Sequence, residues 1–433
     1  MELSVIVTIP STFKRIGAIT LSSALVISGT SLAYPETAKA KPCWNYRPTL
    51  PEILAANGSS ESSSPSALGS LGDILPNASG STASFIEGRP VGLPNVTGTT
   101  EAIHMVTGPD SPDQLNENGL ASTDLGIMWD AGDGRTLAAF GDSFSCTGQG
   151  DGWHSNALFY TDDVNPSNGI HINGTVNGER SGEFLPTSLK IPGVEHTIIP
   201  TAGVEVGGVQ YMDFMSVKEW GRPGQWTTNY AQTARSTDGG ATWEVMDSTI
   251  RTNRHASRDS RLPTIPTYQA GNENFQMLAF AKPPAGAENS YVYIFGTPNG
   301  RSGSAHLARV PVTDFPNFDA AEYWTGSSWA SGIANARPVF GPHVSELSVQ
   351  YNDHLGAWLA LYETPGGIVV RKADTPQGPW TDATTLVSKT KVPDLYGGYM
   401  YPHQVDNNLY WVATTWQSYN AALYRTDLDA VFN

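Results

Sequence analysis

The chain repeats one kind of unit five times, and this repetition limits its fold more than any other feature. Each unit opens with a run rich in β-branched and aromatic residues and continues through Gly, Asp and Asn turns into further runs. The units open at Asp124, Ile199, Phe275, Glu346 and Tyr399, at spacings of 75, 76, 71 and 53 residues, without amphipathic helical patterns of comparable weight. Such repetition predicts an all-β fold, namely a five-bladed β-propeller.

A local motif supports this prediction independently. Residues 236–243, STDGGATW, fit the Asp-box pattern S-x-D-x-G-x-T-W, a turn between two strands of a propeller blade. In such a turn the Ser, Asp and Thr side chains bind the turn backbone, and the Trp packs beneath it. We therefore expect Asp238 to be structural and not catalytic.

The composition of the chain indicates which kinds of molecule it is expected to bind. Charged residues make up 15% of the chain, against about 25% in a typical soluble protein, while Gly reaches 44 and Trp 12. The formal net charge is −16. Because an acidic surface repels phosphate backbones, nucleic acid is excluded as an expected partner. Trp rings are suited to flat ligands such as sugars.

The N-terminus predicts export. Lys14 and Arg15 precede a mainly apolar run at 16–28, which is short for a bilayer span and is followed by small residues. Cleavage after Ala33 or Ala40 fits, and an uncleaved membrane anchor is the alternative. A secreted or cell-envelope protein without stable membrane insertion after cleavage is expected. We predict a signal peptide at 1–33, an arm and Ser/Gly/Pro-rich linker at 34–84, and the propeller at 85–433.

The two cysteines, Cys43 and Cys146, both follow the predicted cleavage sites. In an oxidising compartment they permit one bridge that ties the N-terminal arm to the loop after Asp142. Whether they are bridged stays open, because bridge geometry cannot be seen in a sequence. Two cysteines cannot form a four-thiolate metal site, and neither a metal site nor a cofactor is expected.

The first unit carries the candidate catalytic pair. Residues 125–129 and 137–140 are predicted strands, and Ala131-Gly132-Asp133-Gly134 is a hairpin-turn sequence. Asp124 and Asp142 then lie at one end of one hairpin. Glycoside hydrolysis uses two carboxyl groups about 5 to 9.5 Å apart, one as proton donor and one as nucleophile or base. The alternative is that both are turn residues whose side chains bind nearby backbone.

Five segments, taken in order, carry a resemblance to a known family. They are GDSF at 141–144, EWGRPGQWTTNY at 219–230, YIFGTPNGRSGSAHLARV at 293–310, SELSVQYNDHLGAW at 345–358 and YGGYMYPHQ at 396–404. On these motifs, residues 100–433 resemble the secreted actinobacterial endo-D-arabinanases, long catalogued only as a domain of unknown function.

The resemblance implies a five-bladed propeller that cleaves internal α-D-arabinofuranosyl linkages in the arabinan of arabinogalactan and lipoarabinomannan. It also implies two essential aspartates 18 residues apart in the first blade, which Asp124 and Asp142 match. Ser143 stands where the family pattern usually has Thr, a change that keeps the hydroxyl group.

Further polar and aromatic residues are candidates for the same site. Glu346 is expected to tune a neighbouring pKa or to donate a proton, with an ordinary strand-edge Glu as the alternative. The candidate substrate-binding residues are Arg301, His403, Trp153, Trp226, Tyr399 and Tyr401. Each of these is equally compatible with a structural bond or with packing between blades.

Two other functional classes stay open. A sialidase-like glycosidase agrees with the Asp-box but needs an arginine cluster, and the 25 Lys and Arg residues show none. A non-catalytic carbohydrate-binding propeller agrees with the aromatic residues. Oligomeric state and the stereochemical course of hydrolysis cannot be predicted from the sequence.

Overall fold

The computed structural model describes residues 91–113, 120, 122–144, 152–176, 183–284, 286, 291–416 and 418–432. The expected signal peptide, the arm and linker, and both Cys43 and Cys146 lie outside these residues. None of the helices in the described part of the chain has the length and apolar character needed to cross a bilayer.

The described residues form five antiparallel sheets, one for each predicted unit. The first sheet contains β2 (Ser122–Asp130), β3 (Thr136–Phe144), β5 (Ala157–Thr161), β6 (Gly174–Thr175) and, beside β3, β4 (Trp153–His154). The second contains β7 (Thr197–Val206), β8 (Val209–Trp220), β9 (Trp226–Ser236), β10 (Glu244–Val245) and, beside β9, β11 (Arg251–Thr252). The third contains β12 (Met277–Ala281), β13 (Tyr291–Thr297), β14 (Ala305–Pro311), β15 (Glu322–Trp324), β16 (Trp329–Ser331) and, beside β14, β17 (Pro338–Phe340).

The last two sheets contain the C-terminal strands and β1. The fourth contains β18 (Ser345–Asn352), β19 (Ala357–Thr364), β20 (Gly367–Ala373) and β21 (Thr384–Ser388). The fifth contains β22 (Leu395–Met400), β23 (Asn408–Thr415), β24 (Asn420–Asp427) and β1 (Thr100–Met105). The described helices are short: η5 (Pro166–Asn168), η6 (Asp247–Thr249), η7 (Asn272–Asn274), η8 (Phe318–Ala320), η9 (Ile333–Asn335) and α2 (Leu428–Phe432).

The first strand of each unit is the innermost strand of its sheet. These strands follow one another around the axis, with β2 against β7, β7 against β12, β12 against β18, β18 against β22, and β22 against β2. The five sheets are therefore the blades of a five-bladed propeller, and the predicted fold class is confirmed. Four predicted units open within two residues of the start of their inner strand, but β22 begins at Leu395, four residues before the predicted opening at Tyr399.

The core is divided into clusters between neighbouring blades. Leu361 packs with Trp411 between the fourth and fifth blades, and Val204 packs with Ile294 between the second and third. The inner strand β12 is covered on both sides and is buried along its whole length. Its sequence, MLAFA, is therefore a continuous apolar run that does not alternate between apolar and polar residues.

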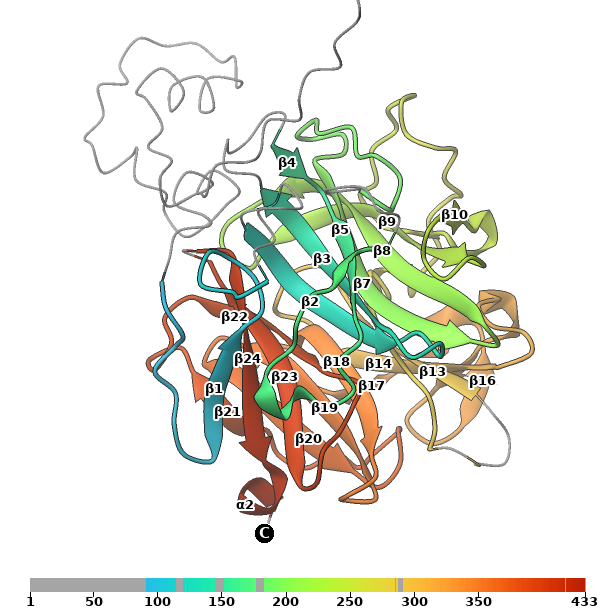
Figure 1. The fold of residues 1–433 in the computed structure, drawn as a ribbon. Helices are drawn as coiled ribbons and strands as arrows, with labels where there is room; N and C mark the ends of the chain where they lie inside the picture. The colour runs from blue at the N-terminus through green and yellow to red at the C-terminus, as the bar shows by residue number, and fades with distance from the viewer. Residues whose placement is uncertain are drawn as a thin grey trace, which may run out of the picture. The chain divides into compact units, whose positions relative to one another are not determined.

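The ring closes through a strand that sequence reasoning missed. β1 pairs antiparallel with β24, so the start of the described chain completes the blade built by its end. Figure 1 shows β1, in blue, beside β24, in dark red. Thr100 and Thr426 face each other across this ladder with their hydroxyl groups 2.9 Å apart and buried.

The Asp-box forms the predicted turn between β9 and β10. Asp238 accepts hydrogen bonds from the Ser236 hydroxyl (2.7 Å), the Thr242 hydroxyl (2.6 Å) and the Thr242 backbone N–H (2.9 Å). Trp243 donates its indole N–H to the Gly240 carbonyl at 2.8 Å. These bonds hold the pKa of Asp238 down to about 2, with the Thr242 hydroxyl as the largest cause. The structural role predicted for Asp238 is confirmed.

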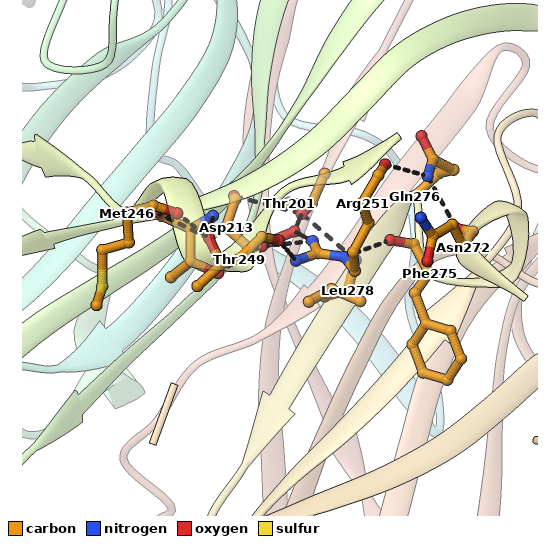
Figure 2. Close-up of polar contacts among 10 residues, drawn as sticks. Thr201, Asp213, Met246, Thr249, Arg251, Asn272, Phe275, Gln276 and Leu278 are labelled. Atoms are coloured by element: carbon orange, nitrogen blue, oxygen red, sulfur yellow. Dashed lines mark hydrogen bonds and ion pairs between the residues drawn. The ribbon is translucent and has the colours of Figure 1, made fainter. Parts of the chain in front are cut away.

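A buried ion pair within the second blade is also hydrogen-bonded to the third blade (Figure 2). Arg251 of β11 donates to both carboxylate oxygens of Asp213 on β8, at 2.6 and 2.7 Å. It also donates to the carbonyl of Phe275, just before β12, at 2.9 Å. Thr201 on the inner strand β7 donates to the same aspartate and accepts from the Leu278 N–H. Thr201 and Leu278 reach the pocket described below, so this network fixes two blades beside it.

Candidate active site

One pocket is lined by residues of all five blades and lies where the inner strands begin. It contains about 890 Å³ of space not filled by atoms, part of which is open to solvent. Its charged residues include Asp124, Asp142, Glu346 and Arg301. Its aromatic residues are Trp220, Trp226, Tyr396, Tyr399, Trp416 and Tyr419. The structure therefore brings together the two predicted catalytic aspartates and most of the supporting residues.

A β-bulge places the two aspartates opposite each other. Thr123 pairs with Ser143 and Leu125 pairs with Phe140, so Asp124 on β2 faces two residues, Gly141 and Asp142, on β3. Leu125 follows with φ of 67° and Gly126 with φ of 135°, and the register shifts again there. Bulges bend a strand and re-aim its side chains. Both carboxylates consequently lie in the same pocket.

Asp124 is 7% exposed, and its two oxygens have different surroundings. The Tyr396 hydroxyl donates to Oδ2 at 3.2 Å, whereas Oδ1 is buried without a hydrogen-bond partner among the described residues. Burial, and then the neighbouring charge of Asp142, raise the pKa of Asp124 well above its usual range. This carboxyl group favours its protonated form and has one oxygen unengaged.

Asp142 is 2% exposed and is held through one oxygen. Its Oδ1 accepts from the Trp153 indole N–H at 2.9 Å and from the Thr197 hydroxyl at 2.7 Å. Burial raises the pKa of Asp142 to about 6, and the bonds from Thr197 and Trp153 oppose that rise. Donors directed at Oδ1 stabilise the ionised carboxylate. Asp142 therefore ionises more readily than Asp124.

A backbone position without a side chain makes this arrangement possible. A Cβ atom on Gly141 would lie 2.3 Å from Oδ1 of Asp124, closer than atoms can approach. Gly126 is restricted in the same way, because a Cβ there would lie 2.8 Å from a methyl group of Val412. Gly141 therefore leaves room for the Asp124 carboxylate within the first blade, and Gly126 lets the fifth blade approach the first.

Across the pocket, Arg301 joins two glutamates. Its guanidinium contacts Glu346 on β18 at 2.7 Å and Glu363 on β19 at 3.1 Å. Lys389 also pairs with Glu363, and Ser345 donates to Glu346. Burial raises the pKa of Glu363 to about 7. Burial by itself would raise the pKa of Glu346, but the charge and hydrogen bonds of Arg301 outweigh burial and lower that pKa.

Glu363 was missed by sequence reasoning. It lies at the end of β19 within Ala357–Thr364, where it is nearly fully buried. The only signal is a carboxylate in an otherwise apolar run, and a strand-end Glu of this kind is ordinarily exposed. Its pairing with Arg301 depends on a contact between the third and fourth blades.

Arg301 is also surrounded by aromatic rings. Its guanidinium carbon lies 5.7 Å from the ring centre of Trp226, 5.3 Å from Tyr396 and 5.2 Å from Trp416. Tyr396 and Trp416 are stacked at 4.1 Å. Trp226 and Tyr399, both predicted as substrate-binding residues, line this pocket.

Three predicted substrate-binding residues have other surroundings. Trp153 is not among the lining residues but orients Asp142 from behind. Tyr401 is buried and donates its hydroxyl to the Asp163 carbonyl. His403 contacts the Thr136 hydroxyl at 2.9 Å and lines a second pocket at the opposite ends of the inner strands. The structure does not bring Tyr401 and His403 to the aspartates, because the chain after β22 leads away from the pocket.

Comparison with known proteins gives relatives in Aspergillus and in a mycobacterium. The chain is 28% identical over 336 residues to the notoamide biosynthesis cluster protein J' of Aspergillus versicolor, which covers 69% of this chain and 82% of that protein. It is 24% identical over 305 residues to an uncharacterized 35.9 kDa protein from the asd 3' region of Mycolicibacterium smegmatis, covering 66% and 84% respectively.

Solved structures give more distant similarities. A putative hydrolase from Bacteroides ovatus has a TM-score of 0.45 at 13% identity, covering 71% of this chain and 86% of that one. An exo-β-1,3-galactanase from Phanerochaete chrysosporium has a TM-score of 0.45 at 6% identity, covering 77% and 63%. Residues 110–425, well over half of the chain, match a single family. The chain belongs to the family described as Domain of unknown function (DUF4185).

Proposed function

We propose that this protein is a secreted glycoside hydrolase, an endo-D-arabinanase that cleaves internal α-D-arabinofuranosyl linkages in cell-wall arabinan. The observation that carries the proposal is the pair Asp124 and Asp142, two buried carboxyl groups opposed at one bulge in one pocket. Their surroundings separate their pKa values, and such separation is what allows one carboxyl group to act as acid and the other as base or nucleophile.

The surroundings of the two aspartates support one role for each. Asp124 retains its proton because its pKa lies well above the usual range, and Oδ1 is unengaged among the described residues. It is the general acid that protonates the leaving oxygen. Asp142 loses its proton at about pH 6 and acts as the nucleophile or base, oriented by Trp153 and Thr197.

Glu346 and Arg301 support this division. The lowered pKa of Glu346 keeps that residue ionised, and Arg301 balances its charge. The carboxylate of Glu346 contributes to raising the pKa of Asp124. Glu346 is therefore a positioning residue that helps Asp124 hold its proton.

The pocket fits a neutral sugar better than an acidic one. Among the described lining residues the arginines are Arg222 and Arg301, and Arg301 is already paired with Glu346 and Glu363. A sialidase-like site needs several arginines directed at a substrate carboxylate. Of the six aromatic side chains that line the pocket, Trp220 and Trp416 are partly exposed and can offer stacking faces for sugar rings. The choice of D-arabinofuranose rests on the resemblance of the motifs, among them GDSF at 141–144.

The test is release of oligosaccharides from purified arabinogalactan. We expect Asp124→Asn and Asp142→Asn each to lower kcat by at least ~100-fold while the proteins stay folded, because Asn keeps the shape and removes proton transfer. Glu346→Gln should cost less or shift the pH optimum. The matched control is Glu205→Gln, a carboxylate of the opposite pocket paired with Lys282, which should retain full activity.

Other outcomes would change the proposal. A folded Asp142→Asn protein with half of the wild-type rate would reject the catalytic pair. Release of monosaccharide alone, or equal rates on plant L-arabinan, would reject the specificity. Arabinan binding without any cleavage would indicate a carbohydrate-binding propeller.

Placement outside the cytoplasmic membrane belongs to the same proposal. It rests on the expected signal peptide at 1–33 and on the substrate, a cell-wall polymer. The intact mass of exported, unreduced protein checks this expectation and the Cys43–Cys146 bridge together. A mass that includes Met1 contradicts cleavage, and alkylation of two thiols contradicts the bridge.

A further inference from the structure

Three side chains with metal-binding atoms meet where the last blade joins the first. His104 belongs to β1, Asp113 to the loop after β1, and His171 to the segment between η5 and β6. One ligand atom from each lies within 4.8 Å of those of the other two. The three residues, called here the closure cluster, lie apart from the catalytic pocket, since none of them lines it.

The side chains of the closure cluster are already oriented toward one another. The Nδ1 atom of His171 lies 3.0 Å from Oδ1 of Asp113, and the rings of His104 and His171 are 5.0 Å apart at 69°. The other oxygen of Asp113, Oδ2, accepts the Ile172 N–H at 2.7 Å. This second bond fixes the carboxylate, as outer-shell bonds do in metal sites.

One ring nitrogen of His104 is a candidate ligand atom. Nε2 of His104 is buried and has no hydrogen-bond partner among the described residues. A buried polar atom ordinarily has a partner, so one without a partner needs an explanation. Gly169 makes room for the His104 ring, because a Cβ atom there would lie 2.7 Å from Nδ1 of His104. The ring therefore fits against the backbone at Gly169, and Nε2 remains available for a ligand.

The charge around the cluster favours a cation. Asp163 lies beside it and accepts the His171 backbone N–H on Oδ2 at 2.6 Å. Two carboxylates, Asp113 and Asp163, therefore lie near two imidazoles. A divalent ion bound by neutral imidazoles would balance both negative charges.

We propose that His104, Asp113 and His171 form a binding site for a divalent transition-metal ion of the zinc type. Two imidazoles and one carboxylate are a known ligand set for Zn²⁺, with a fourth position left for water. Imidazole donors favour Zn²⁺, Cu²⁺ and Ni²⁺ over Mg²⁺ and Ca²⁺, which prefer oxygen ligands.

The ion would join two parts of the ring that are far apart in the sequence. β1 closes the fifth blade against β24, while His171 lies in the first blade between β5 and β6. A metal held by both would tie the closing strand to its neighbouring blade. An ion that binds the folded state alone stabilises that state. The inference is independent of the reaction proposed for Asp124 and Asp142.

The test is a zinc titration of the full chain, purified without a polyhistidine tag and first stripped with a chelator. We expect one Zn²⁺ per chain, measured by competition with a chromophoric chelator. We also expect the midpoint of thermal unfolding to rise by about 5 °C when free zinc exceeds its Kd about a hundredfold. Mg²⁺ at the same concentration should give no rise.

The variants His104→Gln and His171→Gln keep polar side chains and remove one imidazole each. Each should weaken zinc binding at least ~10-fold and reduce the thermal shift at the same free zinc to about half or less. The matched control is His354→Gln, which breaks an exposed His–Asp pair with Asp429 and should bind zinc like the wild type.

Three outcomes would overturn the proposal. The first is a wild type that binds no zinc in competition, and the second is a His171→Gln variant that binds zinc as tightly as the wild type. The third is a His354→Gln variant that loses as much affinity as the cluster variants. Because His171 is partly exposed, its replacement should leave the fold intact. Thermal unfolding of each metal-free variant shows whether it is folded. If His171→Gln does not fold, the zinc affinity of His104→Gln tests the proposal by itself.

Discussion

At the scale of single residues, the candidate site depends on a glycine beside each carboxylate as much as on the carboxylates. Asp142 follows Gly141, and Asp124 lies two residues before Gly126. A Cβ atom at either glycine would meet another side chain at 2.3 or 2.8 Å. The opposed carboxyl groups therefore need backbone positions without side chains.

The substitution Gly141→Ala tests this requirement. The added methyl group must displace the Asp124 carboxylate, because the two would be 2.3 Å apart. We expect kcat on arabinan to fall by about 100-fold, the cost of misplacing a catalytic group by about 1 Å. The control is Gly366→Ala, an exposed position where the new atom meets the Thr364 hydroxyl at an ordinary 3.7 Å. Equal rates for the two variants would contradict the geometry.

The buried carboxyl group of Asp142 makes the free energy of unfolding decrease as pH rises. Burial raises its pKa to about 6 from an ordinary 3.8, so the folded state favours the protonated form. The stability that this preference contributes is fully present below about pH 4 and is lost as pH rises through about 6. Asp142→Asn should therefore be more stable than the wild type at pH 8, by up to about 3 kcal/mol, and should match it near pH 3.5.

Chemical unfolding at these two pH values measures the difference. Asp382→Asn is the control, because Asp382 is exposed and its replacement should have the same small effect at both. A stability gain that is identical at pH 3.5 and pH 8 would contradict burial of the Asp142 charge. The activity of the wild type should also decline below about pH 6, as the proposed nucleophile becomes protonated.

At the scale of strands and blades, a buried polar network accompanies the apolar packing between the second and third blades. The bidentate pair of Arg251 and Asp213 is buried, with side chains 3% and 0% exposed. It joins β11 and β8 to the chain entering β12. The pocket residues Thr201 and Leu278 belong to the same network.

We expect Arg251→Met to destabilise the protein by about 3 to 5 kcal/mol, because Asp213 would be left as a buried charge without its partner. The comparison is Arg235→Met on β9 in the same sheet, where Arg235 pairs with Glu244 on the surface. Such an exposed pair contributes about 0 to 1 kcal/mol. Urea unfolding of both variants measures the difference, and equal losses would show that the buried pair has no special role.

At the scale of the whole molecule, the ring is closed by pairing β1 with β24. Without β1, β24 would present an unpaired strand edge, and the fifth blade would lose its outer strand. Unpaired edges promote association between chains. The closing strand therefore protects an edge as well as completing a sheet.

Two shortened chains test ring closure. A chain beginning at Val91 keeps β1, whereas one beginning at Thr107 lacks it. We expect the first to unfold cooperatively near the wild-type temperature. The second should unfold at least ~10 °C lower or aggregate. Similar midpoints for the two chains would show that β1 is dispensable.

The sequence by itself determined the fold class, the inner strands and the candidate pair. Runs of β-branched and aromatic residues, Gly/Asp turns such as 131–134, and the Asp-box at 236–243 are local signals whose structure is decided by neighbouring residues. β2 and β3 extend further than the predicted 125–129 and 137–140. The polar residues at the ends of these two strands complete the hydrogen-bonded ladder that carries Asp124 and Asp142. Because those residues are polar, a search for apolar runs does not detect the strand ends.

The tertiary structure decided which distant residues meet. The pairing of β1 with β24, of Arg301 with Glu363, and of His104 with His171 joins positions whose separation carries no local pattern. The tertiary structure also decided the positions of Tyr401 and His403, which lie close to β22 but outside the pocket. Local turn and strand preferences specify each blade, whereas the way blades pack around the axis decides which side chains share one pocket. That packing depends on many buried contacts at once, and no short segment of the sequence encodes it.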